Sequence, residues 1–151
     1  MEPIEQIVAI VEPGAKVLRT WPLSGGISCA MTGVEVERPD GSAHKLVVRE
    51  VGKWSFENYP NSVRNEESLL RYLADQGVPV ATPRYHDLSC EILERPFLVL
   101  DYMAGSPDLT TLDRVKRVTI MAETLAKIHS VKTTDSVFEF LSPSPVKLRP
   151  L

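Results

Sequence analysis

A glycine-containing segment near the N-terminus carries the residues best suited to contact an anionic group. Backbone N–H groups between two strands can point at phosphate oxygens when no side chain intervenes, and glycine permits that approach. An ordinary glycine hairpin is the alternative, and such a segment taken alone favours it. The segment consists of Leu23, Ser24, Gly25, Gly26, Ile27 and Ser28.

Two residues of opposite charge occupy positions that point inward. Alternation along a strand places Val47 and Arg49 on one face. Glu66 lies three and four residues before Leu69 and Leu70, so it shares the apolar face of a helix. An acidic group on such a face usually requires a cation as its partner. The alternatives are a solvated arginine at a strand end and a first-turn glutamate that complements the helix dipole.

The sequence patterns around these residues predict a mixture of helices and strands, which is an α+β fold. Helical spacing indicates a first helix near residues 4–11, a second over 62–76 and a long amphipathic helix over 112–131. Gly77 is expected to end the second helix. Segment 52–60 is expected to be looser and to fold over a neighbouring surface. Runs rich in β-branched residues predict strands over 16–21, 29–37, 45–51, 84–88 and 96–103.

Composition excludes several classes of protein. The 151 residues carry a net charge of −3 and a pI near 5.6, which disfavours a binder of nucleic acid or of membrane surfaces. No apolar run approaches the length of a membrane span, and the N-terminus lacks the pattern of a secretory signal. Cys29 and Cys90 lie far apart, so neither a disulfide scaffold nor a zinc site is expected. These features favour a cytoplasmic protein.

Several blocks, in order along the chain, resemble the aminoglycoside phosphotransferase and choline-kinase-like family of the protein-kinase-like superfamily. The resemblance covers roughly residues 17–129 and depends on the joint order and spacing of the blocks. The blocks are Leu23–Ser28, Val47–Arg49, Glu66 with Leu73, Gly77–Val80, Phe97–Gly105 and Leu125–His129.

The resemblance implies a protein-kinase-like N-lobe: a five-stranded antiparallel sheet with an inserted αC-type helix, followed by a hinge and the first helix of a C-lobe. We therefore expect an N-terminal helix over 1–15 and a nucleotide-binding N-lobe over 16–103. The hinge and first C-lobe helix would occupy 104–131, and an irregular tail 132–151.

The resemblance also implies that ATP or GTP binds between the glycine segment and the hinge. Arg49 would reach the α- and β-phosphates and pair with Glu66, while Val47 would contact the base. Residues around the base would be Leu23 and Met31 as the roof, Leu100 as lining, and the Asp101 carbonyl and Met103 N–H on the adenine edge.

The chain departs from the family pattern at residues that contact the phosphates or carry out the reaction. Relatives often carry asparagine where this sequence has Cys29, and the family's H-G-D motif followed by asparagine does not occur in the sequence. His129 is expected to be structural, and His44 and His86, which have no partners at metal-ligand spacing, are expected at the surface. We therefore assign no catalytic and no metal-binding residue, and we expect magnesium only where a missing lobe is supplied.

The expected partners are a nucleotide and, for a full-length relative, a small molecule with a hydroxyl group. We interpret the chain as a truncated phosphotransferase that is inactive alone, or as one that a separate C-lobe chain completes. A non-catalytic, pseudokinase-like binding or interaction module is the alternative. The apolar stripe of the long helix would then lack its usual neighbours, which predicts low stability of the isolated chain.

Overall fold

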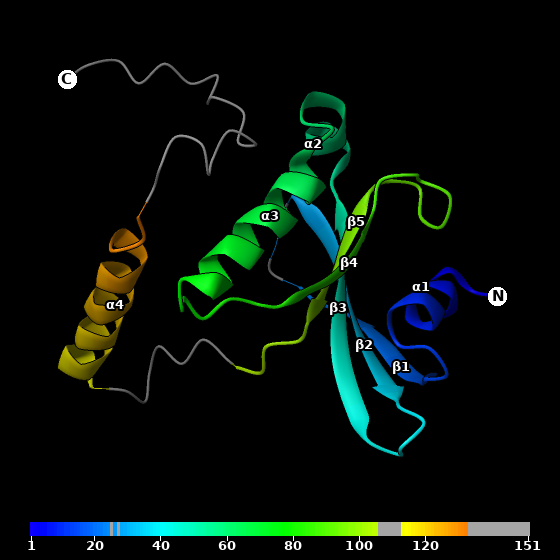
Figure 1. The fold of residues 1–151 in the computed structure, drawn as a ribbon, viewed down its shortest axis with the longest axis horizontal. Coiled ribbons are helices and arrows are strands. Elements are labelled where there is room, and N and C mark those ends of the chain that lie inside the picture. The colour runs from blue at the N-terminus through cyan, green and yellow to red at the C-terminus, as the bar shows by residue number, and fades with distance from the viewer. Residues whose placement is uncertain (25, 27, 106–112, 133–151) are drawn as a thin grey trace. The chain divides into compact units, whose positions relative to one another are not determined.

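The computed structural model describes residues 1–24, 26, 28–105 and 113–132 (Figure 1). The chain divides into two compact units, Met1–Thr110 and Thr111–Leu151, and each unit is described by itself. The irregular tail predicted for 132–151 and the break predicted after Gly105 lie almost entirely outside the described residues.

A five-stranded antiparallel sheet forms the centre of the first unit, with strand order β1-β2-β3-β5-β4. This confirms the predicted sheet. The fifth strand was expected to continue to Met103, but it ends at Asp101, and Tyr102 and Met103 leave the sheet. The strands are β1 (Lys16–Pro22), β2 (Cys29–Glu37), β3 (Ala43–Val51), β4 (Pro83–Asp87) and β5 (Phe97–Asp101).

Three helices accompany the sheet in the first unit. They are α1 (Pro3–Val11), α2 (Lys53–Asn58) and α3 (Ser62–Asp75). The looser segment expected over 52–60 was wrong in part, because α2 occupies most of it. Six residues make fewer than two helical turns, which is too short for a periodic pattern to identify.

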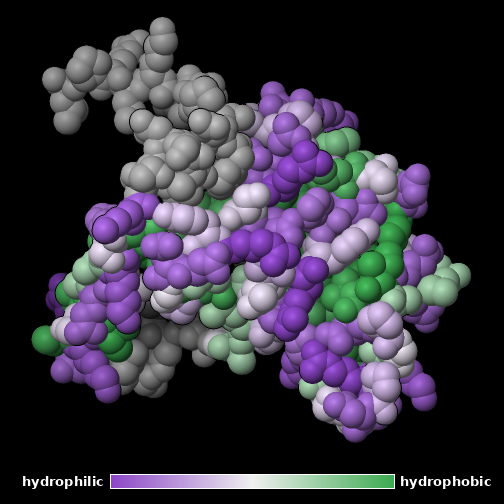
Figure 2. Space-filling view, in the orientation of Figure 1, coloured by the Kyte–Doolittle hydropathy of each residue, from purple (hydrophilic) through white to green (hydrophobic). Residues whose placement is uncertain are grey.

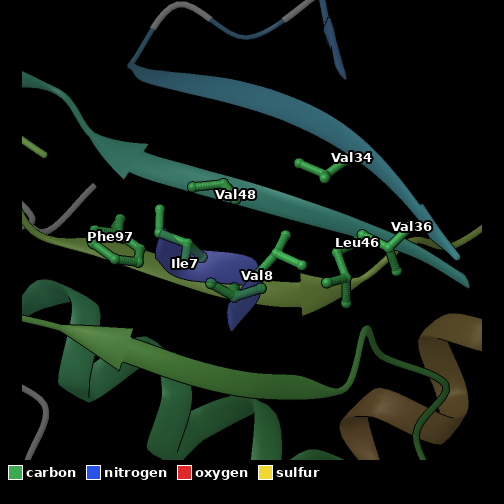
Figure 3. Packing of buried hydrophobic residues seen from close by; sticks show 8 residues of the cluster. Ile7, Val8, Val34, Val36, Leu46, Val48 and Phe97 are labelled. Atoms are coloured by element: carbon green, nitrogen blue, oxygen red, sulfur yellow. The ribbon is translucent and has the colours of Figure 1, made fainter. Parts of the chain in front are cut away.

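Strand alternation divides the apolar side chains of the sheet between two faces. Helix α1 covers one face with Ile7 and Val8, which are buried against residues of β2, β3 and β5 (Figure 3). Helix α3 packs on the other face through Val63, which joins a second cluster. The middle of β3 and most of β5 are thus buried on both faces, and their successive residues belong to different layers. The second cluster is built on Val47, Val51, Val63, Leu98 and Leu100.

Helix α3 ends as the sequence predicts. Gly77 has φ of +74°, a left-handed conformation that glycine adopts without strain. The Gly77 N–H donates to the Ala74 carbonyl at 2.9 Å, and the Val78 N–H donates to the Leu73 carbonyl at 3.0 Å. This pattern satisfies the last carbonyls of the helix. The outward surface over α3 is largely hydrophilic (Figure 2).

The second unit contains helix α4 (Arg114–His129), whose N-terminus is capped by the Asp113 carboxylate, which accepts from the Val115 N–H. Its large apolar side chains are exposed, among them Met121 at 65% and Leu125 at 52%. Within the described part of the chain, no helix combines the length and apolar character needed to cross a bilayer.

Helix α1 should be an integral part of the core rather than a separate appendage. Replacing the fully buried Ile7 by alanine is expected to lower the free energy of unfolding by about 2–5 kcal/mol, because a cavity opens beneath the sheet. The half-exposed Ile10 lies on the same helix, and Ile10→Ala should change stability by no more than about 0.5 kcal/mol. Urea unfolding of both variants measures the difference. Equal losses would contradict the packing of α1 described here.

Candidate functional site

A cavity of about 290 Å³ opens between the start of β2, β3 and the end of β5. Its volume is at the lower end of the range for small-molecule pockets, about 300 Å³ and above. Apolar side chains make up most of the lining, as expected where a flat, weakly polar group is to be bound. The lining residues are Leu23, Met31, Val47, Ala81, Leu100, Asp101, Tyr102 and Met103.

The sequence had singled out six of these residues, and the structure brings them together around one cavity. Leu23 and Met31 are joined where the Leu23 N–H donates to the Met31 carbonyl at 2.9 Å. Val47 and Leu100 are paired across β3 and β5. Ala81 and Tyr102 had not been predicted, because neither residue type carries a signal for a binding site.

The glycine segment connects β1 to β2 beside this cavity. Ser24, Gly26 and Ser28 are exposed, and a methyl group added at Gly26 would meet no atom within 4 Å. The backbone at Gly26 is therefore accessible to a ligand. Gly25 and Ile27 were also predicted to contribute, and both lie outside the described residues.

Arg49 and Glu66 form the ion pair that the sequence predicts. The Arg49 Nη1 donates to the Glu66 Oε2, joining β3 to α3. Arg49 is opposite Met31 in the pairing of β2 with β3, so the cation lies on the face of the sheet that carries the cavity. The Arg49 side chain keeps 24% of its surface exposed, which leaves the guanidinium accessible from solvent.

Burial disfavours the ionised form of the Glu66 carboxylate. Burial raises the pKa of the Glu66 carboxyl above its usual value, and the neighbouring Arg49 cation offsets only part of that effect. A charged group that is buried at a net cost is more common at functional sites than in purely structural cores. The pair is thus better suited to hold an arginine in place than to stabilise the fold.

The far end of the cavity is formed by the segment where β5 leaves the sheet. The Asp101 N–H donates to the Thr82 carbonyl at 2.9 Å, and the Tyr102 N–H donates to the Lys45 carbonyl at 3.0 Å. The next backbone donor, the Met103 N–H, bonds to no backbone carbonyl among the described residues. Among the described residues, this donor is thus not engaged by the backbone at the edge of the cavity.

Two glycines outside the predicted segment shape the site through close approach. A methyl group at Gly52 would lie 2.1 Å from the Ser28 carbonyl oxygen, so only glycine lets the end of β3 pass beneath the glycine segment. A methyl group at Gly33 would lie 2.3 Å from the Trp21 ring, which reaches across the sheet to Tyr102. Sequence reasoning missed both, because an isolated glycine in a strand region does not reveal which neighbour approaches it.

The two histidines expected at the surface are only partly exposed and have partners. The Nδ1 of His86 contacts the Glu67 carboxylate, whose side chain is only 13% exposed and also contacts the Nη2 of Arg71. His44 lies between the carboxylates of Glu12 and Asp101. The reason is tertiary: α3 packs against β4, and α1 ends beside β3, so these side chains meet neighbours that are distant in sequence.

No group of three or more histidine, cysteine, aspartate or glutamate side chains suited to a metal ion occurs within the described residues.

Replacement of Glu66 by glutamine should stabilise the fold slightly at neutral pH. The raised pKa means that the folded state favours the protonated carboxyl, so its ionisation costs stability as pH rises through that pKa. The advantage of Glu66→Gln should therefore shrink as pH falls and the wild-type carboxyl becomes protonated. Thermal melting across acid and neutral pH tests this, and a large loss of stability at neutral pH would contradict it.

Gly52→Ala should disturb the glycine segment through a direct clash with the backbone at Ser28. The expected loss of stability is about 1–3 kcal/mol, typical of a group forced into filled space. Gly105→Ala is the matched control, because a methyl group there meets no atom within 4 Å. Denaturant unfolding compares the two. A Gly52→Ala variant as stable as the control would show that the close approach is not enforced.

Comparison with known proteins gives a consistent result. The family described as the phosphotransferase enzyme family matches residues 34–150. A solved structure from Ralstonia eutropha, provisionally described as an aminoglycoside phosphotransferase, superposes with a TM-score of 0.59 at 18% sequence identity. The match covers 85% of this chain and 37% of that one, so the chain spans little more than a third of the length of the structure it resembles. No curated protein sequence matches the chain.

At this identity the structural match concerns the fold alone. It agrees with the observed order of strands and helices and with the expected resemblance to the N-terminal part of a kinase-like structure. The family match is a match of sequence, and it extends over well more than half of the residues. The chain belongs to the phosphotransferase enzyme family.

Proposed function

We propose that this chain supplies the nucleotide-binding lobe of a phosphotransferase that uses ATP or GTP to phosphorylate a hydroxyl group of a small molecule. One observation carries the proposal: the Arg49–Glu66 pair lies on the same face of the sheet as the apolar cavity. A cation adjacent to an apolar slot suits a ligand with a flat base at one end and phosphates at the other. Family membership gives independent support for a phosphoryl donor.

In this proposal the base enters the cavity between the roof and β5. Leu23 and Met31 contact it from one side, and Val47 and Leu100 line the slot. The Met103 N–H, which lacks a backbone partner among the described residues, donates to the edge of the base. The Asp101 carbonyl is its neighbour at the same edge. Main-chain contacts of this kind recognise the base with little demand on side-chain identity.

The phosphates lie toward the glycine segment and Arg49. The guanidinium presents donors in a planar fork that matches phosphate oxygens, and Glu66 fixes its orientation. The exposed backbone at Gly26 offers N–H donors without side-chain obstruction. Ser24 and Ser28 add hydroxyls on either side of it.

The reaction itself requires groups that this sequence does not contain. Transfer breaks the bond between the terminal phosphorus and its bridging oxygen, forms a bond to the acceptor oxygen, and passes the hydroxyl proton to a base. The H-G-D motif that relatives use for this step does not occur in the 151 residues. The chain therefore contributes binding and positioning, and the base and metal ligands belong to a C-terminal lobe.

The absence of the H-G-D motif from the sequence also fits a second candidate, a non-catalytic nucleotide-binding module. Both candidates require the nucleotide site and differ in whether a C-terminal lobe supplies the base. Activity measured after addition of such a lobe distinguishes them. Gain of phosphorylation supports the first candidate, and unchanged binding without turnover supports the second.

Calorimetric titration with ATP, GTP and adenosine tests the proposed site. We expect ATP or GTP to bind, and Arg49→Ala to weaken that binding by about tenfold or more through loss of charge-assisted hydrogen bonds. Adenosine lacks phosphates, so its affinity should be nearly the same for Arg49→Ala and the wild type.

Arg64→Ala provides the control, because Arg64 is an exposed arginine on the helix that carries Glu66. It should bind ATP as the wild type does. A wild-type chain that binds neither ATP nor GTP nor adenosine would refute the proposed function, and equal losses for adenosine and ATP in Arg49→Ala would refute the role of Arg49.

A further inference from the structure

A chain of charged groups runs behind the cavity, from the end of α1 to the end of β5. At the first end, the Glu12 carboxylate accepts from Arg38 twice, at 3.0 Å from Nε and 2.7 Å from Nη2. The Nδ1 of His44 lies 2.8 Å from the Glu12 Oε1 and 2.7 Å from the Arg38 Nη2. These contacts join the C-terminus of α1 to the hairpin between β2 and β3.

At the other end, the same histidine reaches the strand that borders the cavity. The Nε2 of His44 lies 3.3 Å from the Asp101 Oδ1. Arg84 of β4 donates to both oxygens of that carboxylate, at 2.6 Å from Nε and 2.8 Å from Nη2. Asp101 is thus held on its side chain by β4 and β3, while its backbone lines the cavity beside Tyr102 and Met103.

We propose that Arg84 and His44 are positioning residues for the base-binding edge of the nucleotide site, and that His44 couples this edge to helix α1. This inference rests on the proposed function. The two donors of Arg84 fix the plane of the Asp101 carboxylate, and with it the point where the chain turns toward Met103. A bidentate guanidinium–carboxylate contact has the directional character needed for that task.

His44 bridges the two ends through both ring nitrogens. Its Nδ1 faces the Glu12 carboxylate and the Arg38 guanidinium, and its Nε2 faces the Asp101 carboxylate. A neutral imidazole that carries its proton on Nε2 donates to Asp101 and accepts from Arg38, so the bridge does not require a charged histidine. Among the described residues, three charged groups contact His44, namely Glu12, Arg38 and Asp101, while Arg84 faces it through Asp101 and Asp40 faces it through Arg38.

The chain contains an internal reporter for this edge. Trp21 lies with its ring centroid 5.9 Å from that of Tyr102, in an edge-on arrangement. Trp54 is the second of two tryptophans and is 65% exposed, so Trp54→Phe leaves Trp21 as the sole indole. Emission of Trp21 then reports on the segment at Tyr102 without any nucleotide.

The test measures nucleotide affinity and Trp21 emission in this background. Arg84→Ala should weaken binding of ATP about tenfold and shift the emission, because a charge-assisted contact is lost. Arg84→Lys should recover part of both, since it restores the charge without the fork. Arg95→Ala is the matched control, because Arg95 pairs with Glu50 at 2.7 Å near the opposite end of β5, and its ATP affinity should stay within about twofold of wild type.

Trp21 emission of the His44→Ala variant tests the role of His44. It should shift as in Arg84→Ala, whereas His86→Ala should keep the wild-type emission because His86 pairs elsewhere, with Glu67. Circular dichroism melting confirms that each variant is folded at the temperature of measurement.

The results distinguish failure of the positioning network from failure of the proposed nucleotide-binding function. An Arg84→Ala variant with wild-type emission and wild-type ATP affinity overturns the positioning role, and wild-type emission in His44→Ala overturns the coupling. A wild-type chain that binds no nucleotide refutes the proposed function and the nucleotide role of Arg84. The emission of Arg84→Ala then still decides whether the network positions this segment.

Discussion

The contact between Arg49 and Glu66 is the interaction on which the rest of the site depends. It joins the third strand to the helix that follows, and it places a cation beside an apolar slot. Burial raises the pKa of Glu66, so the pair is maintained at some cost to the fold. Apolar packing near the pair offsets this cost, since Val63 and Leu98 are almost fully buried. The fold thus holds the Arg49 guanidinium next to a carboxylate whose ionised form burial disfavours.

The sheet meets two demands because alternate residues face opposite ways. In β3, Leu46 and Val48 complete the layer under α1, while Val47 and Arg49 face the cavity and α3. Helix α1 therefore covers one face of the sheet, and the opposite face carries α3 and the cavity. The charged groups at the end of α1 connect it through His44 to Asp101 at the edge of the cavity.

Much of the fold could be predicted because its signals are local. Alternation along β3 fixed the face of Arg49, helical spacing fixed that of Glu66, and Gly77 marked the end of α3. The remaining features depend on contacts between distant segments. Glu67 and His86 meet only because α3 packs on β4, and Gly52 is needed only because the backbone of Ser28 passes beside it. A short helix such as α2 lies below the length at which periodicity can be detected.

A double-mutant cycle on Arg49 and Glu66, with ATP affinity as the readout, tests the central claim most directly. If the carboxylate acts by orienting the guanidinium, the effects of Arg49→Ala and Glu66→Gln are strongly non-additive, with a coupling energy of about 0.5–3 kcal/mol. The double variant then binds ATP no more weakly than Arg49→Ala alone. Additive losses would contradict the account, because they would mean that the two side chains serve the ligand, or the fold, independently.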